Sequence, residues 1–88
     1  MEAYRYGGEE FLVLAAPGGG AAAAAESIVK RVSELGIPFD ASPFGKVTIS
    51  AGCSARGNAA ASLAALIKQA DKALYKAKQS GRNRAAYA

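Results

Sequence analysis

Two adjacent carboxylates, Glu9 and Glu10, follow two glycines, Gly7 and Gly8, between two short runs of β-forming residues. Glycine reaches positive φ without steric cost, so this pair predicts a tight hairpin turn. Folding alone gives no reason for two acids at the tip of a turn, because like charges repel unless cations or donors offset them. We therefore expect Glu9 and Glu10 to bind a divalent metal, with bare glycine backbone beside them for a phosphate chain. An ordinary acidic turn is the alternative.

The two acids are consecutive, and successive side chains of a regular strand point to opposite faces. We therefore expect Glu9 and Glu10 to have different roles, one toward a metal or substrate and the other toward the body of the protein.

Lys78 and Arg82 form a second group, four residues apart near the end of an expected helix. If the helix continued, both side chains would lie on one face. They could then hold adjacent phosphates, Arg82 through its planar fork and Lys78 as a point charge. The alternative is that these cations complement the negative end of the helix dipole.

Asp71 and Tyr75 are four residues apart on the same expected helix, and Asp71 is seven residues before Lys78. This spacing puts them on one face, beside the apolar stripe. We expect Asp71 and Tyr75 to tie the helix to its neighbours by hydrogen bonds rather than to take part in catalysis.

Elements that position these groups follow from the spacing of apolar residues and from the turn formers. Five alanines and the spacing of Ile28, Val32 and Leu35 favour a helix, which Gly36 and Pro38 end. The expected elements are strands over 3–6 and 10–15, a helix over 21–35, a strand over 46–54, a helix over 63–80 and a short edge strand within 82–88.

The second helix is the best defined, because its apolar residues form a continuous stripe and Gly81 ends it. Asn58 or Ser62 could cap its start. The order β-β-α-β-α-(β) predicts an α+β domain, with a mixed or antiparallel sheet that packs helices on one or both faces. The apolar stripe comprises Leu63, Leu66, Ile67, Ala70, Leu74 and Ala77.

The composition of the chain excludes several classes of protein and of site. The 88 residues are 51% hydrophobic, which indicates one small folded domain, or a piece of one, rather than a disordered tail. No apolar run reaches 18 residues, and the start lacks the pattern of a signal peptide. The single cysteine, Cys53, favours a reducing cytoplasm. The absence of histidine excludes imidazole catalysis and zinc sites with histidine ligands.

The net charge is +4, and much of it lies in the last quarter of the chain. Lys68, Lys72 and Lys76 are four residues apart, which is typical of a solvated helix face, although a basic face can also bind phosphates. No motif of a DNA- or RNA-binding protein accompanies them, so we expect no nucleic-acid partner.

Three motifs in order resemble those of the GGDEF family, the diguanylate cyclases. Arg5-Tyr6-Gly7-Gly8-Glu9-Glu10-Phe11 is similar to the central motif in its GGEEF form. Val47-Thr48-Ile49-Ser50-Ala51-Gly52 resembles a VTxSxG strand, and 70–78 with Gly81-Arg82-Asn83 resembles the closing ADxALYxAKxxGRN run. The resemblance covers 1–88 and identifies the chain as a partial GGDEF domain, the C-terminal half of a nucleotidyl-cyclase, ferredoxin-like palm.

The resemblance implies an enzyme that condenses two GTP molecules into cyclic di-GMP and releases pyrophosphate, for bacterial second-messenger signalling. Two domains meet head to head, and each 3′-hydroxyl attacks the other's α-phosphate. It implies that Glu9 and Glu10 bind Mg²⁺ or Mn²⁺ or activate the hydroxyl. Gly7 and Gly8 would let the nucleotide approach the backbone. Lys78 and Arg82 would hold the terminal phosphates.

The family's domain begins well before this hairpin, with a strand that carries an aspartate metal ligand and helices that read guanine. From this resemblance we expect little or no activity from the 88 residues alone, and a homodimer or higher oligomer that covers unpaired strand edges and apolar faces. A non-catalytic module that binds nucleotide or a partner protein is the alternative function. A fragment with no role of its own is a further alternative.

Overall fold

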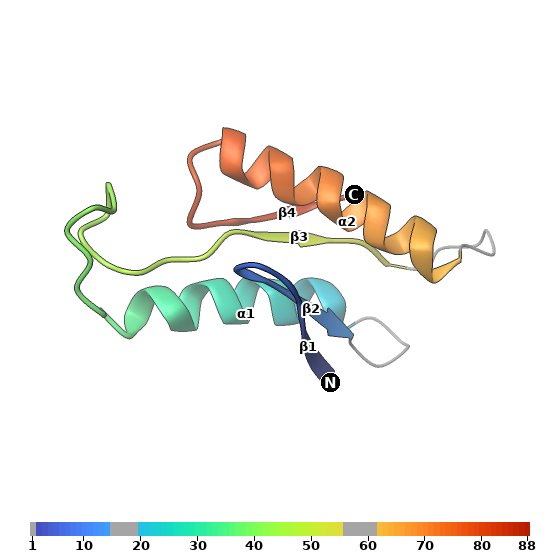
Figure 1. Cartoon of the computed structure of the whole chain (residues 1–88), viewed down its shortest axis with the longest axis horizontal. Helices are drawn as coiled ribbons and strands as arrows, with labels where there is room; N and C mark the ends of the chain where they lie inside the picture. The colour runs from blue at the N-terminus through green and yellow to red at the C-terminus, as the bar shows by residue number, and fades with distance from the viewer. Residues whose placement is uncertain (1, 15–19, 56–61) are drawn as a thin grey trace.

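The computed structural model describes residues 2–14, 20–55 and 62–88, which form two helices and four strands (Figure 1). The chain is therefore of the α+β class, as expected. In chain order the elements are β1 (Glu2–Gly7), β2 (Glu10–Leu14), α1 (Ala21–Glu34), β3 (Ala51–Cys53), α2 (Leu63–Gln79) and β4 (Ala85–Tyr87).

The expectation of one sheet is wrong for the described residues, whose strands form two separate pairs. β1 and β2 pair antiparallel, whereas β3 and β4 pair parallel. A parallel pair needs a long crossover, and α2 provides it. The expected edge strand within 82–88 is present as β4, which lies beside β3 with Ala51 opposite Ala85.

Helices cover both faces of the β3–β4 pair, with α2 on one side and α1 on the other (Figure 1). Gly52 permits the close approach of α2. A Cβ at this position would overlap the carbonyl oxygen of Ala70 and lie 2.7 Å from the Cα of Leu74. The middle of β3 therefore requires glycine, because any side chain would push the helix off the sheet.

The strand expected over 46–54 is shorter than the pattern predicts, since only Ala51–Cys53 is paired as a strand. Lys46 forms an isolated antiparallel bridge with Pro38, and the Val47 N–H donates to the Ile37 carbonyl at 2.8 Å. Residues 47–50 are all half-buried, but they have no strand partner within the described part of the chain. Half-burial of these residues is not enough to make a strand, because a strand also needs a neighbouring strand with which to pair.

Both helices begin and end near the expected residues. The hydroxyl of Ser62 accepts from the Ala65 N–H at 3.1 Å and caps α2; Asn58, the other candidate cap, lies outside the described residues. α1 ends at Glu34, and Gly36 follows in the left-handed region at φ 63°. Leu35, expected on the apolar face, is exposed. Neither described helix is long and apolar enough to cross a membrane.

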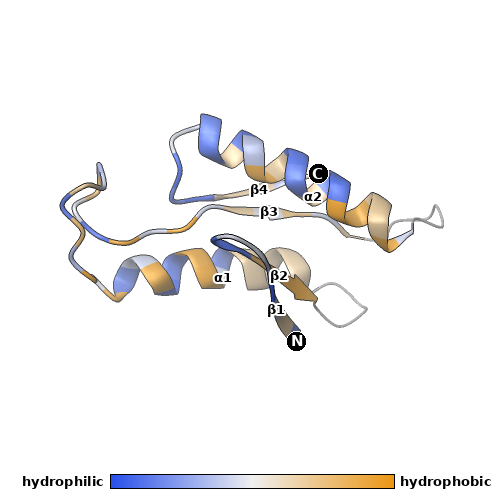
Figure 2. Ribbon diagram, in the orientation of Figure 1, coloured by the Kyte–Doolittle hydropathy of each residue, from blue (hydrophilic) through white to orange (hydrophobic). Residues whose placement is uncertain are grey.

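Among residues 2–14, 20–55 and 62–88, three hydrophobic residues are buried: Val29 of α1, and Ala73 and Ala77 of α2. Figure 2 shows hydrophobic and hydrophilic residues alternating along both helices. The accessible surface is 6270 Å², against about 4,800 Å² for a compact monomer of this size. The chain therefore exposes more total surface than an isolated compact domain of 88 residues normally does.

Candidate functional site

The hairpin predicted from the glycine pair is present, and Gly7 pairs with Glu10 across a two-residue loop of Gly8 and Glu9. Gly8 has φ 54°, whereas Glu9 is not among the residues with positive φ. This is the pattern of a type II′ turn, whose first central position favours glycine. Only Gly8 therefore needs the conformational freedom of glycine for the turn.

Glu9 and Glu10 do not occupy successive strand positions, so strand alternation does not apply to them. Glu9 lies in the turn and is exposed, whereas Glu10 begins β2 and is half-buried. The pairing also shifts register between Arg5 and Gly7, which leaves Tyr6 as a bulge. Because a bulge re-aims the neighbouring side chains, the two acids differ in surroundings through the turn rather than through strand alternation.

Arg5 holds the turn, a role that residue type and spacing did not predict. Its Nε and Nη2 both donate to the Gly8 carbonyl, at 3.2 and 3.0 Å. The guanidinium fork thereby fixes the backbone beside Glu9. Arg5 belongs to the run that resembles the family motif, so the motif was the available signal, but no spacing rule predicts a contact between a side chain and a turn carbonyl.

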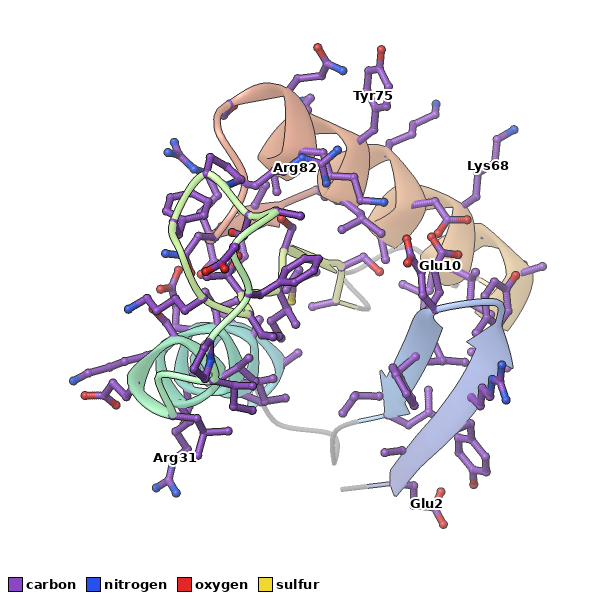
Figure 3. The ribbon with its side chains drawn as sticks, turned by 60° about the vertical axis from the view of Figure 1, so that its left-hand side comes forward. Glu2, Glu10, Arg31, Lys68, Tyr75 and Arg82 are labelled. Carbon is purple, nitrogen blue, oxygen red and sulfur yellow. The ribbon has the colours of Figure 1, made fainter. Side chains whose placement is uncertain are left out.

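Glu10 and Lys78 line one open hollow of about 230 Å³, together with Asp71, Leu74 and Tyr75. Figure 3 shows Glu10 at the tip of the hairpin, beneath α2, which carries the other four residues. The structure thus brings a predicted acid and a predicted phosphate ligand to the same place. Two carboxylates and one ammonium group share this hollow, a mixture that suits a metal bound together with an anion.

Asp71 and Tyr75 were expected to make hydrogen bonds to neighbouring elements. Among residues 2–14, 20–55 and 62–88, neither side chain makes such a bond, and Tyr75 is 65% exposed. Both instead line the hollow with Glu10 and Lys78. Their spacing from Lys78 was visible in the sequence, but the position of the hairpin opposite this face was not.

Lys78 and Arg82 do not share a helix face, because α2 ends at Gln79. The Arg82 N–H donates to the Ala77 carbonyl at 3.0 Å, a six-to-one bond that closes the helix end as in a Schellman motif. Gly81 has φ 123°, and Arg82 follows at φ 64°. Arg82 therefore leaves from a left-handed turn and is not part of the hollow's lining.

The glycines beside the acids have open space around them. A Cβ at Gly7 or Gly8 would meet no atom within 4 Å, so a ligand could approach the backbone there. In the described part of the chain, no three Asp, Glu, Cys or His side chains gather as a metal site would. Glu9 and Glu10 supply at most part of the oxygen ligands that Mg²⁺ requires, since Mg²⁺ takes about six.

Cys53 is the free cysteine of the chain and lies in β3, half-buried. Burial raises the pKa of its thiol, so the group stays protonated near neutral pH. Cys53 is therefore a packing residue of the sheet rather than a nucleophile.

The predicted basic face of α2 is exposed and lines a second open hollow of about 500 Å³. Asp71 and Tyr75 line both hollows, so the basic face and the hollow at Glu10 adjoin. The basic residues of this face are Lys68, Lys72 and Lys76. Their exposure agrees with the interpretation of a solvated face.

Comparison with known proteins gives the same assignment as the motifs. The chain is 45% identical over 84 residues to diguanylate cyclase A of Treponema denticola, an alignment that covers 93% of this chain and 22% of that protein. It is 44% identical over 84 residues to the response regulator PleD of Caulobacter vibrioides, covering 90% of this chain and 18% of that protein. The chain spans about a fifth of the length of these relatives.

A family model, diguanylate cyclase, GGDEF domain, matches residues 2–84, nearly the whole chain. The GGEEF turn and the end of α2 both lie within this match. The chain therefore belongs to the GGDEF domain family.

Proposed function

We propose that this chain forms part of a diguanylate cyclase site, in which α2 and its following turn hold the phosphates of GTP and the hairpin holds a metal. The full domain would condense two GTP molecules into cyclic di-GMP and release pyrophosphate, each 3′-hydroxyl attacking the other α-phosphate. The observation that carries this proposal is the hollow that Glu10 and Lys78 line together. Family membership supports the reaction class. A partial ferredoxin-like palm is the fold that we propose.

Lys78 and Arg82 are the residues that we expect to hold the terminal phosphates. Lys78 comes from the last turn of α2, and Arg82 from the left-handed turn just beyond it. Two cations from adjacent segments can bind neighbouring phosphates even though they do not share a helix face. Phosphoryl transfer depends mostly on such positioning and charge neutralisation.

Glu9 and Glu10 are the residues that would hold Mg²⁺ or Mn²⁺, because carboxylate oxygens are the ligands that these ions prefer. The bound ion would neutralise charge that develops on the phosphates. Since two side chains fill only part of the ion's coordination, we expect the metal to bind tightly only together with the triphosphate. Glu10, which shares the hollow with Lys78, is the better placed of the two.

Triphosphate binding by the 88-residue chain tests this proposal. We expect Lys78→Ala to weaken the binding of GTP with Mg²⁺ about tenfold, the effect of one charge-assisted hydrogen bond. Lys68→Ala is the matched control: it removes the same charge from the same helix but lines only the other hollow. Titration calorimetry measures both. Equal losses of affinity for the two variants would mean that Lys78 contributes only through the overall charge of the chain, and would overturn the proposed site.

The activity of the isolated chain is a separate part of the proposal. We expect it to release little pyrophosphate and to form little cyclic di-GMP from GTP and Mg²⁺, because its acids supply only part of a metal site. Chromatography of the nucleotide products measures this. Turnover at about 1 s⁻¹ or faster, an ordinary enzyme rate, would contradict the expectation.

We propose that the chain works in the cytoplasm and associates with itself as a homodimer or higher oligomer. The excess accessible surface and the exposed aromatic residues Tyr4, Tyr6 and Phe11 support association. The free Cys53 supports a reducing compartment. Sedimentation at high concentration tests the oligomer, and a monodisperse monomer would contradict it.

A non-catalytic module remains the second candidate, because Glu10 and Lys78 could hold a nucleotide without turning it over. Calorimetry with cyclic di-GMP separates the two functions. A substrate site should prefer GTP with Mg²⁺, whose triphosphate reaches both the acids and the cations, whereas a sensor should bind the cyclic product without a metal.

A further inference from the structure

The turn that joins α2 to β4 holds two consecutive residues in the left-handed region, a conformation that most L-residues avoid. Arg82 has φ 64° and Asn83 has φ 49°, and neither is a glycine. Such a turn persists only where the surrounding structure holds it in place. The turn therefore needs partners beyond its own backbone.

Arg84 supplies that support with its side chain. Its Nε donates to the Arg82 carbonyl at 3.0 Å. Its guanidinium also folds back over Gly81, where Nη2 lies 2.8 Å from the point that a Cβ would occupy. One side chain thus covers the first residue of the turn and bonds the second.

Arg84 is itself fixed to the sheet. Its backbone carbonyl accepts from the Ala51 N–H at 3.0 Å, next to the pairing of β3 with β4. The Arg82 N–H donates to Ala77 at the end of α2. Arg82 is therefore held on both sides, by the helix through its N–H and by Arg84 through its carbonyl.

We propose that Arg84 is a positioning residue for Arg82: it locks the left-handed turn so that the Arg82 guanidinium is presented to phosphate. Arg84 acts through the backbone of the turn and need not touch the ligand. The proposal rests on the proposed function, because it gives Arg82 the phosphate role. Its effect is entropic, since a preorganised guanidinium loses less freedom when phosphate binds.

A double-mutant cycle on the 88-residue chain tests this, with inorganic tripolyphosphate and Mg²⁺ as the probe. We expect Arg82→Ala to weaken binding about tenfold and Arg84→Ala about threefold to fivefold. In the Arg82→Ala background, Arg84→Ala should cause no further loss, because the residue that it positions is gone. Arg31→Ala, on α1, removes the same charge far from this turn and serves as the control (Figure 3).

Two further measurements distinguish a positioning role of Arg84 from an effect of its charge on binding and from a general loss of stability of the fold. Arg84→Lys keeps the charge but not the Nε donor, so it should weaken binding as Arg84→Ala does. Amide hydrogen exchange should quicken at Arg82 in both variants while Leu74, within α2, stays protected.

The possible results are distinct. Additive losses in the cycle, or full affinity in Arg84→Lys, would overturn the positioning role while leaving the proposed function intact. No loss in Arg82→Ala would overturn the phosphate site itself, and the inference with it. Loss of protection at Leu74 would assign Arg84 to general stability and would likewise overturn the inference.

Discussion

The proposed site has two sides, which we call its two walls: the β3–α2–β4 unit carries the cations and the β1–β2 hairpin carries the acids. The two walls differ in how tightly they are packed. α2 buries Ala73 and Ala77 against the sheet, and Gly52 lets the helix approach the backbone of β3. Every residue of β1 is exposed, and alternate residues of β2 are only half-buried. The cations thus come from a packed unit, whereas the acids come from an element with little packing.

This difference suggests how the site is used. A packed helix end offers phosphate a fixed partner, and fixed partners cost little entropy on binding. A loosely packed hairpin can be ordered by what it binds, so its acids contribute most once metal and triphosphate are both present. Local stability should therefore differ between the two regions.

Gly52→Ala should have the largest effect, because the new Cβ overlaps backbone of α2 rather than a flexible side chain. We expect a loss of about 3 kcal/mol in the free energy of unfolding, at the upper end for overpacking. Gly7→Ala, in the hairpin, adds the same methyl group to open space and should change stability by about 0.5 kcal/mol or less. Urea denaturation followed by circular dichroism measures both. Similar losses would mean that the two regions are equally packed.

Ser62→Ala should come next, since it removes the hydroxyl that accepts from the Ala65 N–H at the start of α2. Loss of a helix cap costs about 1 kcal/mol. Ser42→Ala removes a similar bond, to the Phe44 N–H, from an exposed loop that neither wall uses, and it should cost less. If Ser42→Ala cost as much as Ser62→Ala, the cap of α2 would contribute no more to the stability of the fold than a hydrogen bond in an exposed loop.

The packed unit should also show a dependence on high pH. The hydroxyl of Tyr87, in β4, donates to the Glu26 carboxylate of α1. This hydrogen bond, with burial and the negative charge of Glu26, raises the pKa of Tyr87 to about 12 from its usual 10. A raised pKa means that the stabilisation is complete below pH 10 and is lost as the pH rises through 12.

Urea midpoints measured between pH 9 and pH 12 test this coupling. Tyr87→Phe should make the fall in stability over this range smaller than in the wild type, while the raised pKa of Cys53 leaves part of the fall in place. Tyr4→Phe is the control, because Tyr4 bonds Glu2 within the hairpin and should leave that fall in place. A fall as large in Tyr87→Phe as in the wild type would contradict the coupling between β4 and α1.

The sequence predicted the local elements well, because their causes are local. The turn at Gly8, the cap at Ser62 and the edge strand at Ala85–Tyr87 all follow from residue type and spacing. The single sheet was wrong, because pairing between distant strands leaves no local signal. The end of α2 at Gln79 mattered most for the site, since it moved Arg82 off the helix face shared with Lys78.

The members of the proposed site stay predictions from the motifs, and their arrangement had no signal in the sequence. Motif resemblance named Glu9, Glu10, Lys78 and Arg82, but nothing in the spacing showed that Glu10 would reach the face of Asp71 and Tyr75. Contacts made by long side chains to backbone carbonyls, such as that of Arg5 on Gly8, also have no periodic signal. These depend on the three-dimensional path of a turn, which residue type constrains only loosely.

Phe11→Ser should have the smallest effect on stability and is the sharpest test of the loose hairpin. Phe11 is 72% exposed in the single chain, so at a protein concentration where the chain is monomeric we expect a change of about 0.5 kcal/mol or less. Val29→Ser, in the buried face of α1, is the matched control and should cost about 3 kcal/mol, since it removes buried methyl groups and buries a hydroxyl. At high concentration, where we expect the chain to associate, a loss of both stability and sedimentation coefficient in Phe11→Ser would mean that the hairpin packs against a second copy of the chain. The hairpin would then be loosely packed only in the monomer, and the difference in packing between the two walls would disappear in the oligomer.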